Sequence, residues 1–288
     1  MKLLLTGADG FTGRHLTDAA LAAGYEVFPL KADLTDATAV STEVVAIAPT
    51  HVVHLAAISA VTHADENAFY QVNLFGTLNL LKALVALPVA PAKVLLASSA
   101  NVYGNQDGVA IAETVCPQPV NHYAMSKLAM EHMAATYTDR LPIVMTRPFN
   151  YTGVGHDLRF VIPKIVDHFV RKAPVIELGN LDVYREYNDV RQVCDVYLKL
   201  LGHGVPGEVY NVCSGNAVSL GEVLALMTEI SGWQPEVRVN PAFVRANEIR
   251  TLAGSSEKLA SCIGQVSGGD LRPLLEWMYR SLGSGNTQ

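Results

Sequence analysis

Residues 2–16 read Lys2-Leu-Leu-Leu-Thr-Gly-Ala-Asp-Gly-Phe-Thr-Gly-Arg-His-Leu16, and this stretch decides the fold. Its three leucines predict a short buried strand. Glycines follow at positions 7, 10 and 13, where the strand pattern stops and a helical spacing of apolar residues begins. The stretch therefore predicts a strand, a tight glycine turn and the start of a helix.

A glycine turn of this kind can bind an anion. It brings backbone N–H groups and a helix N-terminus against a pyrophosphate, because glycine admits a positive φ and a close approach. The spacing here is Gly-x-x-Gly-x-x-Gly, whereas the dinucleotide fingerprint is Gly-x-Gly-x-x-Gly. Taken alone, the turn fits a phosphate site and an ordinary glycine-rich loop equally well.

The composition of the 288 residues indicates a folded α/β protein. Half of the residues are apolar and 17% are charged, which excludes a disordered chain and suits a buried parallel sheet. The net charge is −6 without a basic block, so we expect no nucleic-acid surface. No apolar run approaches the ~20 residues of a membrane span, and the N-terminal segment turns polar at Thr6. We therefore expect no membrane partner, no signal segment and a cytoplasmic location.

The histidine and cysteine spacing does not indicate a metal site. His51 and His54 share an expected strand with no carboxylate or cysteine at metal spacing, so we expect them to pack in the core or at the strand end. The cysteines show no zinc-type spacing, and we expect them to be reduced packing residues: Cys116, Cys194, Cys213 and Cys262.

Beyond the first helix, expected strands and helices alternate. The strands span 25–30, 51–57, 93–99 and 207–213, and the helices span 40–48, 68–86, 121–137, 190–201 and 219–232. This alternation predicts an α/β fold on a doubly wound parallel sheet. The 51–57 strand ends in the small residues Ala56 and Ala57, which leave room for a ligand lying across the strand ends.

The end of the second strand favours one of the two nicotinamide dinucleotides. A carboxylate at this place binds the ribose 2′-hydroxyl of NAD and repels the 2′-phosphate of NADP. Here the place is held by Leu30 and Lys31, and Arg14 follows the third glycine, so the charges favour NADP and leave NAD open. Asp33 comes slightly later, and it fits a contact with the adenosine and a simple turn aspartate about equally.

Candidate acid–base chemistry lies in the 121–137 helix. Tyr123 and Lys127 are four residues apart, which places a phenol and an ammonium on one helix face. A nearby ammonium favours the phenolate and is expected to lower the phenol pKa towards neutral pH. A Tyr-x-x-x-Lys pattern is common by chance, but here it follows the glycine turn, the small strand end and the Ser98-Ser99 strand end in one α/β series.

With these landmarks in order, the chain resembles the short-chain dehydrogenase/reductase superfamily in its extended branch of nucleotide-sugar epimerases, dehydratases and reductases. The resemblance covers nearly the whole length. It rests on Thr6-Gly-x-x-Gly-Phe-x-Gly13, His54-Leu-Ala-Ala57, Asn73-Leu-Phe-Gly-Thr-Leu-Asn-Leu-Leu81, Ser98-Ser-Ala-Asn-Val-Tyr-Gly104, Tyr123-x-x-x-Lys127, Arg147-Pro-Phe-Asn150 and Arg185-Glu-Tyr-x-Asp-Val190. Within the branch, the chain is most similar to GDP-mannose 4,6-dehydratases and GDP-4-keto-6-deoxymannose reductases.

The resemblance implies a role for particular residues. The catalytic set is Ser99, Tyr123 and Lys127. The set that binds NADP, or NAD, is Gly7, Gly10, Phe11, Thr12, Gly13, Arg14, Asp33, Leu34, Leu55, Ala56, Ala57, Asn73, Tyr123 and Lys127. The set that binds a nucleotide-diphosphate sugar is Asn150, Val161, Lys164, Arg185, Arg245 and Glu248.

One departure from the family pattern narrows the activity. The dehydratases carry an acidic residue shortly after the active-site serine or threonine, but Ala100 and Asn101 follow Ser99 here. Water elimination then lacks its acid–base group. The resemblance therefore implies NAD(P)H-dependent reduction of the C4 ketone of a nucleotide-linked 4-keto-6-deoxyhexose, with GDP as the favoured nucleotide. A 4-epimerase with retained NAD is the alternative, and a non-catalytic dinucleotide-binding scaffold is a further one.

The resemblance also implies the domain organisation and the oligomer. A Rossmann-type dinucleotide-binding domain is expected over 1–149 and 187–214, and a smaller interleaved nucleotide-sugar-binding lobe over 150–186 and 215–288. A homodimer is expected to pair the helices at 71–86 and 124–137. These boundaries and contacts are expectations of the family resemblance.

Overall fold

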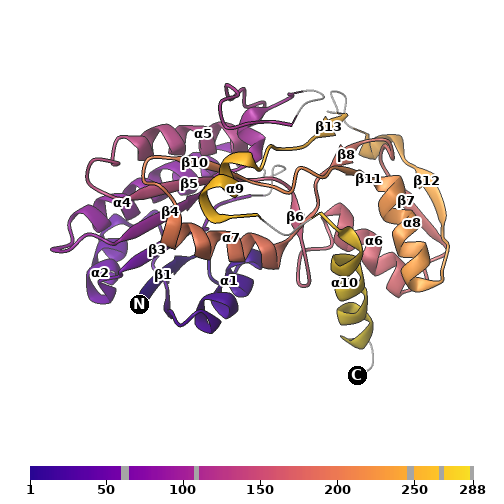
Figure 1. The fold of residues 1–288 in the computed structure, drawn as a ribbon, viewed down its shortest axis with the longest axis horizontal. Coiled ribbons are helices and arrows are strands. Elements are labelled where there is room, and N and C mark those ends of the chain that lie inside the picture. The colour runs from indigo at the N-terminus through magenta and orange to yellow at the C-terminus, as the bar shows by residue number, and fades with distance from the viewer. Residues whose placement is uncertain (60–64, 107–109, 245–249, 266–268, 286–288) are drawn as a thin grey trace.

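A parallel sheet of six strands forms the larger part of the molecule (Figure 1). The structure is a computed structural model that describes residues 1–59, 65–106, 110–244, 250–265 and 269–285. The strands lie in the order β10-β5-β4-β3-β1-β2, and all neighbours are parallel. Their bounds are β1 Lys2–Thr6, β2 Glu26–Pro29, β3 His51–His54, β4 Lys93–Ala97, β5 Ile143–Pro148 and β10 Val209–Val212.

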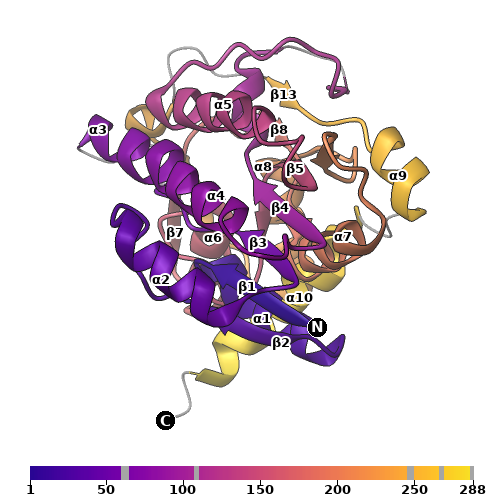
Figure 2. The same cartoon turned by 90° about the vertical axis from the view of Figure 1, so that its left-hand side faces the viewer.

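Helices cover both faces of this sheet, as the alternating sequence predicts (Figure 2). Alternate strand residues face opposite ways: Leu3 and Leu5 pack on one side and Leu4 on the other. The first face is covered by α1 Phe11–Ala22 and α7 Val190–His203, and the second by α2 Ala37–Ile47, α4 Thr77–Val85 and α5 His122–Ala135. The doubly wound parallel fold is therefore confirmed.

The strand order places the switch point of the sheet beside β1. The chain runs from β1 to β2 on one side and then crosses to β3 on the other side of β1. In open α/β sheets, ligands bind outside the carboxyl ends of the strands at such a point. The glycine turn follows β1 and the small residues Ala56 and Ala57 follow β3, so both predicted features lie there.

The segment over 68–86, which the sequence predicts as one helix, is divided into three helical pieces in the structure. It consists of α3 Glu66–Phe69, a π-helical segment over Tyr70–Gly76 and then α4. The wider turns carry Asn73 at their centre, and its side chain hydrogen-bonds the backbone of Ile58 instead of pointing to solvent. A π-helical turn inside an α-helix is frequent at functional sites.

The smaller part of the molecule has its own core (right-hand side of Figure 1). Its helices are α6 Val161–Val170, α8 Leu220–Ser231 and α10 Leu271–Gly285. Short strands complete it in two sheets, one in the order β11-β8-β13 and one pairing β12 with β7. Their bounds are β7 Val175–Leu178, β8 Tyr184–Arg185, β11 Val218–Ser219, β12 Glu236–Val239 and β13 Thr251–Leu252.

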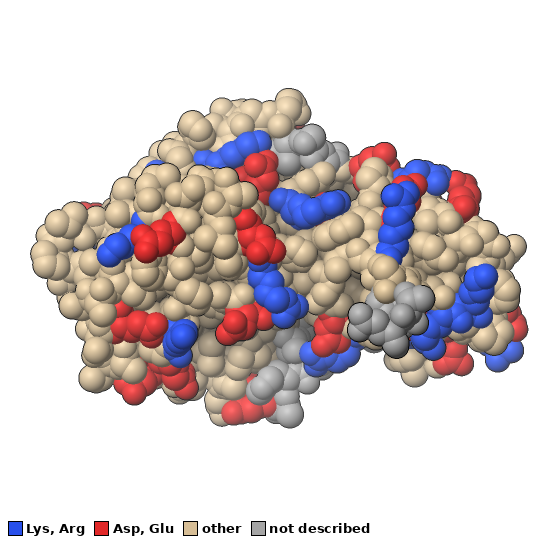
Figure 3. Space-filling view, turned by 90° about the horizontal axis from the view of Figure 1, so that it is seen from below, with Lys and Arg blue, Asp and Glu red and all other residues tan. Residues whose placement is uncertain are grey.

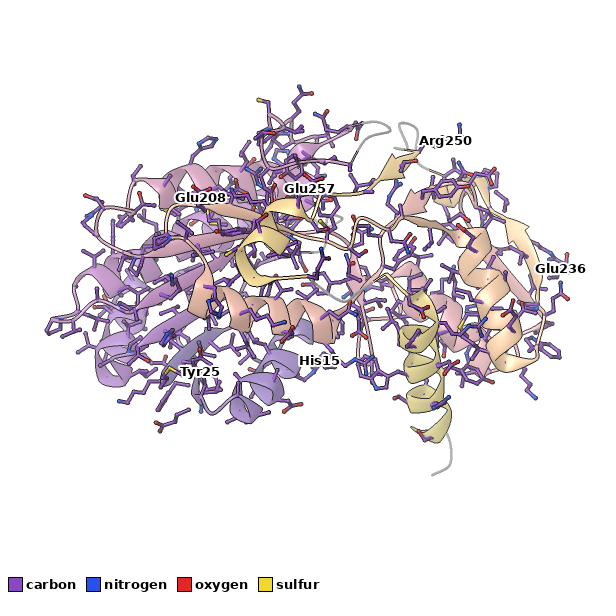
Figure 4. All side chains as sticks on the ribbon, viewed as in Figure 1. His15, Tyr25, Glu208, Glu236, Arg250 and Glu257 are labelled. Atoms are coloured by element: carbon purple, nitrogen blue, oxygen red, sulfur yellow. The ribbon has the colours of Figure 1, made fainter. Side chains whose placement is uncertain are left out.

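The chain crosses between the two parts several times. After β5, the pair β6 Tyr151–Thr152 and β9 Asn188–Asp189 joins the outgoing and returning segments. The helix α9 Glu257–Ile263 follows β13 yet packs on α7 and β10, where Glu257 lies beside Glu208 (Figure 4). The domain boundaries given above stay a prediction.

Candidate active site

The glycine turn has the geometry of a dinucleotide turn. Gly7 has a φ of +71°, and a Cβ at Gly13 would lie 2.1 Å from the carbonyl oxygen of Gly7. A Cβ at Gly7 would lie 2.8 Å from the backbone nitrogen of Ala56, so the turn packs on the chain that follows β3. Gly10 occupies the N-cap of α1 and has no side chain to cap it. The first turn of α1 therefore suits an anion bound by backbone N–H groups.

The side chains of the turn hold the loop that follows β6. Phe11 stacks on His156 with ring centroids 4.3 Å apart, and the Thr12 hydroxyl lies 2.8 Å from the Tyr151 hydroxyl. The Arg14 guanidinium donates to the carbonyl oxygens of Asp9 and Gly155. Three predicted cofactor residues therefore also join the sheet to the smaller part, a contact that the sequence did not indicate.

A carboxylate from α2 fixes the chain directly after β2. Glu43 accepts hydrogen bonds from the backbone N–H groups of Lys31 and Ala32, at 3.0 and 2.7 Å. Asp33 accepts from the backbone and the hydroxyl of Thr35, and these bonds lower the pKa of the Asp33 carboxyl. Asp33 thus makes the local turn that was one of its two expected roles. Leu34 is buried in the core under this turn.

The predicted catalytic residues come together at the carboxyl end of β4. Ser99 begins a 3₁₀ turn over Ala100–Tyr103 and accepts the backbone N–H of Asn101 at 3.2 Å. Tyr123 and Lys127 lie in the first two turns of α5, both buried. The Lys127 ammonium donates to the carbonyl oxygen of Ala97 at 2.7 Å, which anchors α5 on the last residue of β4.

The expected lowering of the Tyr123 pKa is wrong. Burial raises the pKa of the phenol above its usual value, and hydrogen bonding with Ser99 opposes the rise. Lys127 does not lower the phenol pKa, because its ammonium is directed to the Ala97 carbonyl. Burial also lowers the pKa of Lys127 to about 8, against the opposing charge of Glu131. A neutral phenol is the form that donates a proton.

Asn73 and His54 belong to one buried network behind this site. The Asn73 amide accepts from the backbone N–H of Ile58 at 2.9 Å and donates to the Ser126 hydroxyl at 3.0 Å. The Thr77 hydroxyl donates to the carbonyl of Asn73, so His54 Nε2 must be the donor to Thr77. His54 Nδ1 then accepts from the Thr6 hydroxyl at 2.7 Å. Burial lowers the pKa of His54 to about 3, which confirms it as a neutral core histidine.

A buried ion pair lies one helical turn beyond Lys127. Glu131 binds Arg147 through two bonds of 2.6 and 3.0 Å, and both side chains are less than a tenth exposed. Arg147 also donates to the Tyr103 hydroxyl, which donates to Asn211. The sequence analysis did not single out Glu131, although its spacing of four residues from Lys127 was available as a signal.

The predicted substrate residues that the structure describes lie on the smaller part or at its border. Val161 and Lys164 occupy the first turn of α6, and the Lys164 ammonium donates to the Glu177 carbonyl at 2.7 Å. Arg185 lies on β8 and donates to the Tyr184 carbonyl. Asn150 follows β5, and its backbone carbonyl oxygen accepts a hydrogen bond from the Asn188 amide. Arg245 and Glu248 lie outside the described residues. The assignment of all these residues to a ligand stays a prediction.

The described ranges contain neither a metal-binding cluster nor a membrane-spanning helix. No group of three or more histidine, cysteine, aspartate or glutamate side chains there could hold a metal ion. All four cysteines are free, and Cys116 is exposed, so its expected packing role is wrong.

Across the same described ranges, no helix has the length and apolar character to cross a membrane. Lysines, arginines and acidic residues are interspersed on the face seen in Figure 3.

Known proteins of similar sequence and structure cover nearly the whole chain. GDP-6-deoxy-D-talose 4-dehydrogenase of Aggregatibacter actinomycetemcomitans is 38% identical over 98% of both chains. GDP-6-deoxy-D-mannose reductase of Pseudomonas aeruginosa is 36% identical over 91% of both. A solved structure from Burkholderia cenocepacia, of a protein described as an epimerase, is 44% identical over 98% of both chains, with a TM-score of 0.94.

A structure of RMD from Pseudomonas aeruginosa complexed with NADPH is 33% identical over 99% of both chains, with a TM-score of 0.92. The model of the NAD dependent epimerase/dehydratase family matches residues 3–213. This match includes the glycine turn, the Ser99 strand end and the Tyr123–Lys127 helix. The chain belongs to the NAD dependent epimerase/dehydratase family.

Proposed function

We propose that the protein reduces the C4 ketone of a GDP-linked 4-keto-6-deoxyhexose with NADPH. The observation that carries this proposal is the meeting of Ser99, Tyr123 and Lys127 at the end of β4, with a buried alanine, Ala100, where a dehydratase would need a carboxylate. The two named GDP-6-deoxyhexose enzymes, which match the chain over most of its length, support the substrate class.

In this proposal Tyr123 donates the proton. Hydride arriving at C4 would leave a developing alkoxide on the former ketone oxygen. The buried, neutral phenol would protonate that oxygen, and the Ser99 hydroxyl would hydrogen-bond it as its charge forms. Lys127 would hold the nicotinamide ribose with its ammonium group. The dinucleotide supplies the hydride, while the protein supplies position and electrostatics.

NADPH is the proposed reductant. The residues present fit a dinucleotide, because the glycine turn allows close backbone approach and Gly10 leaves the N-terminus of α1 without a side-chain cap. Lys31 follows β2, where NAD-binding chains carry a carboxylate, and Arg14 follows the third glycine, so the charges of the sequence favour a 2′-phosphate. The similarity to the RMD complex with NADPH supports the same choice.

The stoichiometry of the cofactor separates this proposal from an epimerase. Incubating the protein with GDP-4-keto-6-deoxymannose and NADPH should consume the nicotinamide absorbance one for one with product. An epimerase retains its cofactor, so activity on an ordinary UDP-hexose without added dinucleotide would contradict the proposal. The names of the two relatives denote products that differ in configuration at C4, and NMR of the product assigns that configuration here.

We also propose a cytoplasmic homodimer. Phe75, in the π-helical segment, is 47% exposed, and Met125 on the neighbouring α5 is 41% exposed. These apolar side chains lie on the two helical segments that the family resemblance pairs between subunits. Sedimentation equilibrium of the wild type and of Phe75→Glu tests the pairing of the two helical segments, and a monomeric wild type would contradict the homodimer.

Fractionation of the native cells tests the proposed cytoplasmic location.

A further inference from the structure

Glu186 is a buried carboxylate to which the proposed chemistry gives no role. It lies between β8 and β9 and is 1% exposed. One carboxylate oxygen accepts the backbone N–H of Gly254 at 2.6 Å. The other accepts the backbone N–H of Ser214 at 2.7 Å, with the Ser214 hydroxyl and the Asn188 amide both at 3.2 Å. Four donors therefore converge on a single side chain.

These donors come from different crossings between the sheet and the smaller part. Ser214 follows β10, Gly254 follows β13, and Asn188 begins β9 on the return from β8. Asn188 also donates its backbone N–H and its amide to the carbonyl oxygen of Asn150, at 2.9 and 3.1 Å, just after β5. Glu186 thus bonds the segments that follow β10 and β13 directly. Through Asn188, in its own segment, it is also tied to the segment that follows β5.

The surrounding packing leaves this junction little freedom to rearrange. A Cβ at Gly254 would lie 2.6 Å from the Phe149 ring and 2.8 Å from the sulfur of Cys213. Both neighbours are buried in one apolar cluster with Leu252. Backbone N–H groups held in such a place need an acceptor that is already there, because an unpaired buried donor is costly.

We infer that Glu186 is a positioning residue that sets the smaller part against the sheet for binding of the nucleotide sugar. Arg185 precedes it on β8, and Asn150 is tied to it through Asn188, so the carboxylate orients two residues of the predicted substrate set. The inference rests on the proposed function for the identity of the substrate. Glu186 itself needs no contact with the reacting atoms.

Glu186→Gln is the sharpest variant because it keeps the shape of the side chain while it removes the negative charge and replaces one acceptor oxygen with an NH2 donor group. A carboxylate is acceptor-only, whereas the glutamine amide would direct N–H groups at the N–H and O–H donors of Ser214 or at Gly254. The loss of one hydrogen bond to a charged acceptor changes an equilibrium constant, such as that for binding of the sugar, by about tenfold or more. We expect the KM of the GDP-sugar to rise about tenfold or more, and the Kd of NADPH and the kcat at saturation to stay within about threefold.

Glu222→Gln is the matched control. Glu222 also accepts a backbone N–H, from Ser219 at 2.7 Å in the capping box of α8, but it lies on the surface of the smaller part. This variant should leave the KM of the GDP-sugar unchanged. Glu186→Asp, which keeps the charge on a shorter side chain, should recover part of the lost affinity for the sugar.

Amide hydrogen exchange of the full-length protein makes the test independent of the substrate. In Glu186→Gln the amides of Ser214 and Gly254 should lose protection, while those of β4 and α5 keep it. An unchanged KM for the GDP-sugar, or an equal rise in the Kd of NADPH, would overturn the inference. If the wild type does not act on the GDP-sugar, the proposed function fails, and unchanged exchange at Ser214 and Gly254 would then overturn the inference by itself.

Discussion

At the scale of single residues, we expect Lys127 to set the pH dependence of the reaction. The residue is 4% exposed, and burial lowers its pKa to about 8. The ammonium therefore loses its proton as the pH rises through that value, whereas burial raises the pKa of Tyr123 above its ordinary value. Deprotonation of Lys127 removes the positive charge that the proposal places beside the nicotinamide ribose.

The value of kcat/KM for NADPH should accordingly fall above about pH 8, because this ratio reports groups of the free enzyme. The measurement is a pH profile between pH 6 and pH 10, with enzyme stability checked at each pH by prior incubation. Lys127→Met should have low activity throughout and lack this fall. A wild-type profile that stays flat to pH 10 would show that the ammonium charge is not required.

Tyr123 should account for most of the acid catalysis. Tyr123→Phe removes the proton donor and should lower kcat by about 10²–10⁴-fold. Tyr25→Phe is the control, because Tyr25 packs edge-on against His51 at the start of β3, at the amino ends of the strands. Full turnover by Tyr123→Phe would show that another group donates the proton.

The sequence predicts residue contacts well only when they are local. Tyr123 and Lys127 share a helix face because they are four residues apart, and that follows from helix geometry alone. Glu186 meets Gly254 across 68 positions, and no periodic pattern signals such a contact. The expected fall in the pKa of Tyr123 failed for the same reason, since the direction of the Lys127 ammonium depends on β4.

At the scale of elements, the ion pair between Glu131 and Arg147 fastens α5 to β5. Arg147 also donates to the Tyr103 hydroxyl, which in turn donates to Asn211. Removing one partner of a buried pair leaves an uncompensated charge. The position of the helix that carries Tyr123 therefore depends on this pair.

Arg147→Met should lower the free energy of unfolding by about 3–5 kcal/mol, measured by urea denaturation. The cost arises because Glu131 would remain buried without its partner. Arg171→Met is the comparison, because its pair with Asp167 is half-exposed and should contribute no more than about 1 kcal/mol. Equal midpoints for both variants would contradict the structural role of the buried pair.

Regular elements were predictable where their pattern is local. Five of the six parallel strands were predicted as apolar runs, whereas β5 was not among the expected strands. The helices α5, α7 and α8 follow their apolar spacing to within a few residues. The π-helical segment was not predictable, because it depends on the Asn73 amide bonding a backbone 15 positions away. The two-residue strands β6, β8 and β9 were missed because they exist only through their distant partners.

At the scale of the whole molecule, the two parts are interleaved rather than joined by one linker. The loop over 151–156 returns to the glycine turn, and α9 returns to the sheet, so the smaller part is fixed on both sides of the strand ends. This arrangement places the glycine turn after β1, the Ser99 strand end after β4 and Asn150 after β5 at the carboxyl edge of the sheet. The sequence indicated the landmarks, but only the fold brings them together.

The most direct test of the account follows the hydride. The protein is incubated with GDP-4-keto-6-deoxymannose and NADPH carrying deuterium in the transferable position at C4 of the nicotinamide, and the sugar product is examined by NMR and mass spectrometry. We predict one deuterium per product molecule, bonded to C4 of the hexose, with an equal amount of oxidised cofactor. A product without deuterium, or turnover that leaves the added cofactor reduced, would contradict hydride transfer to C4.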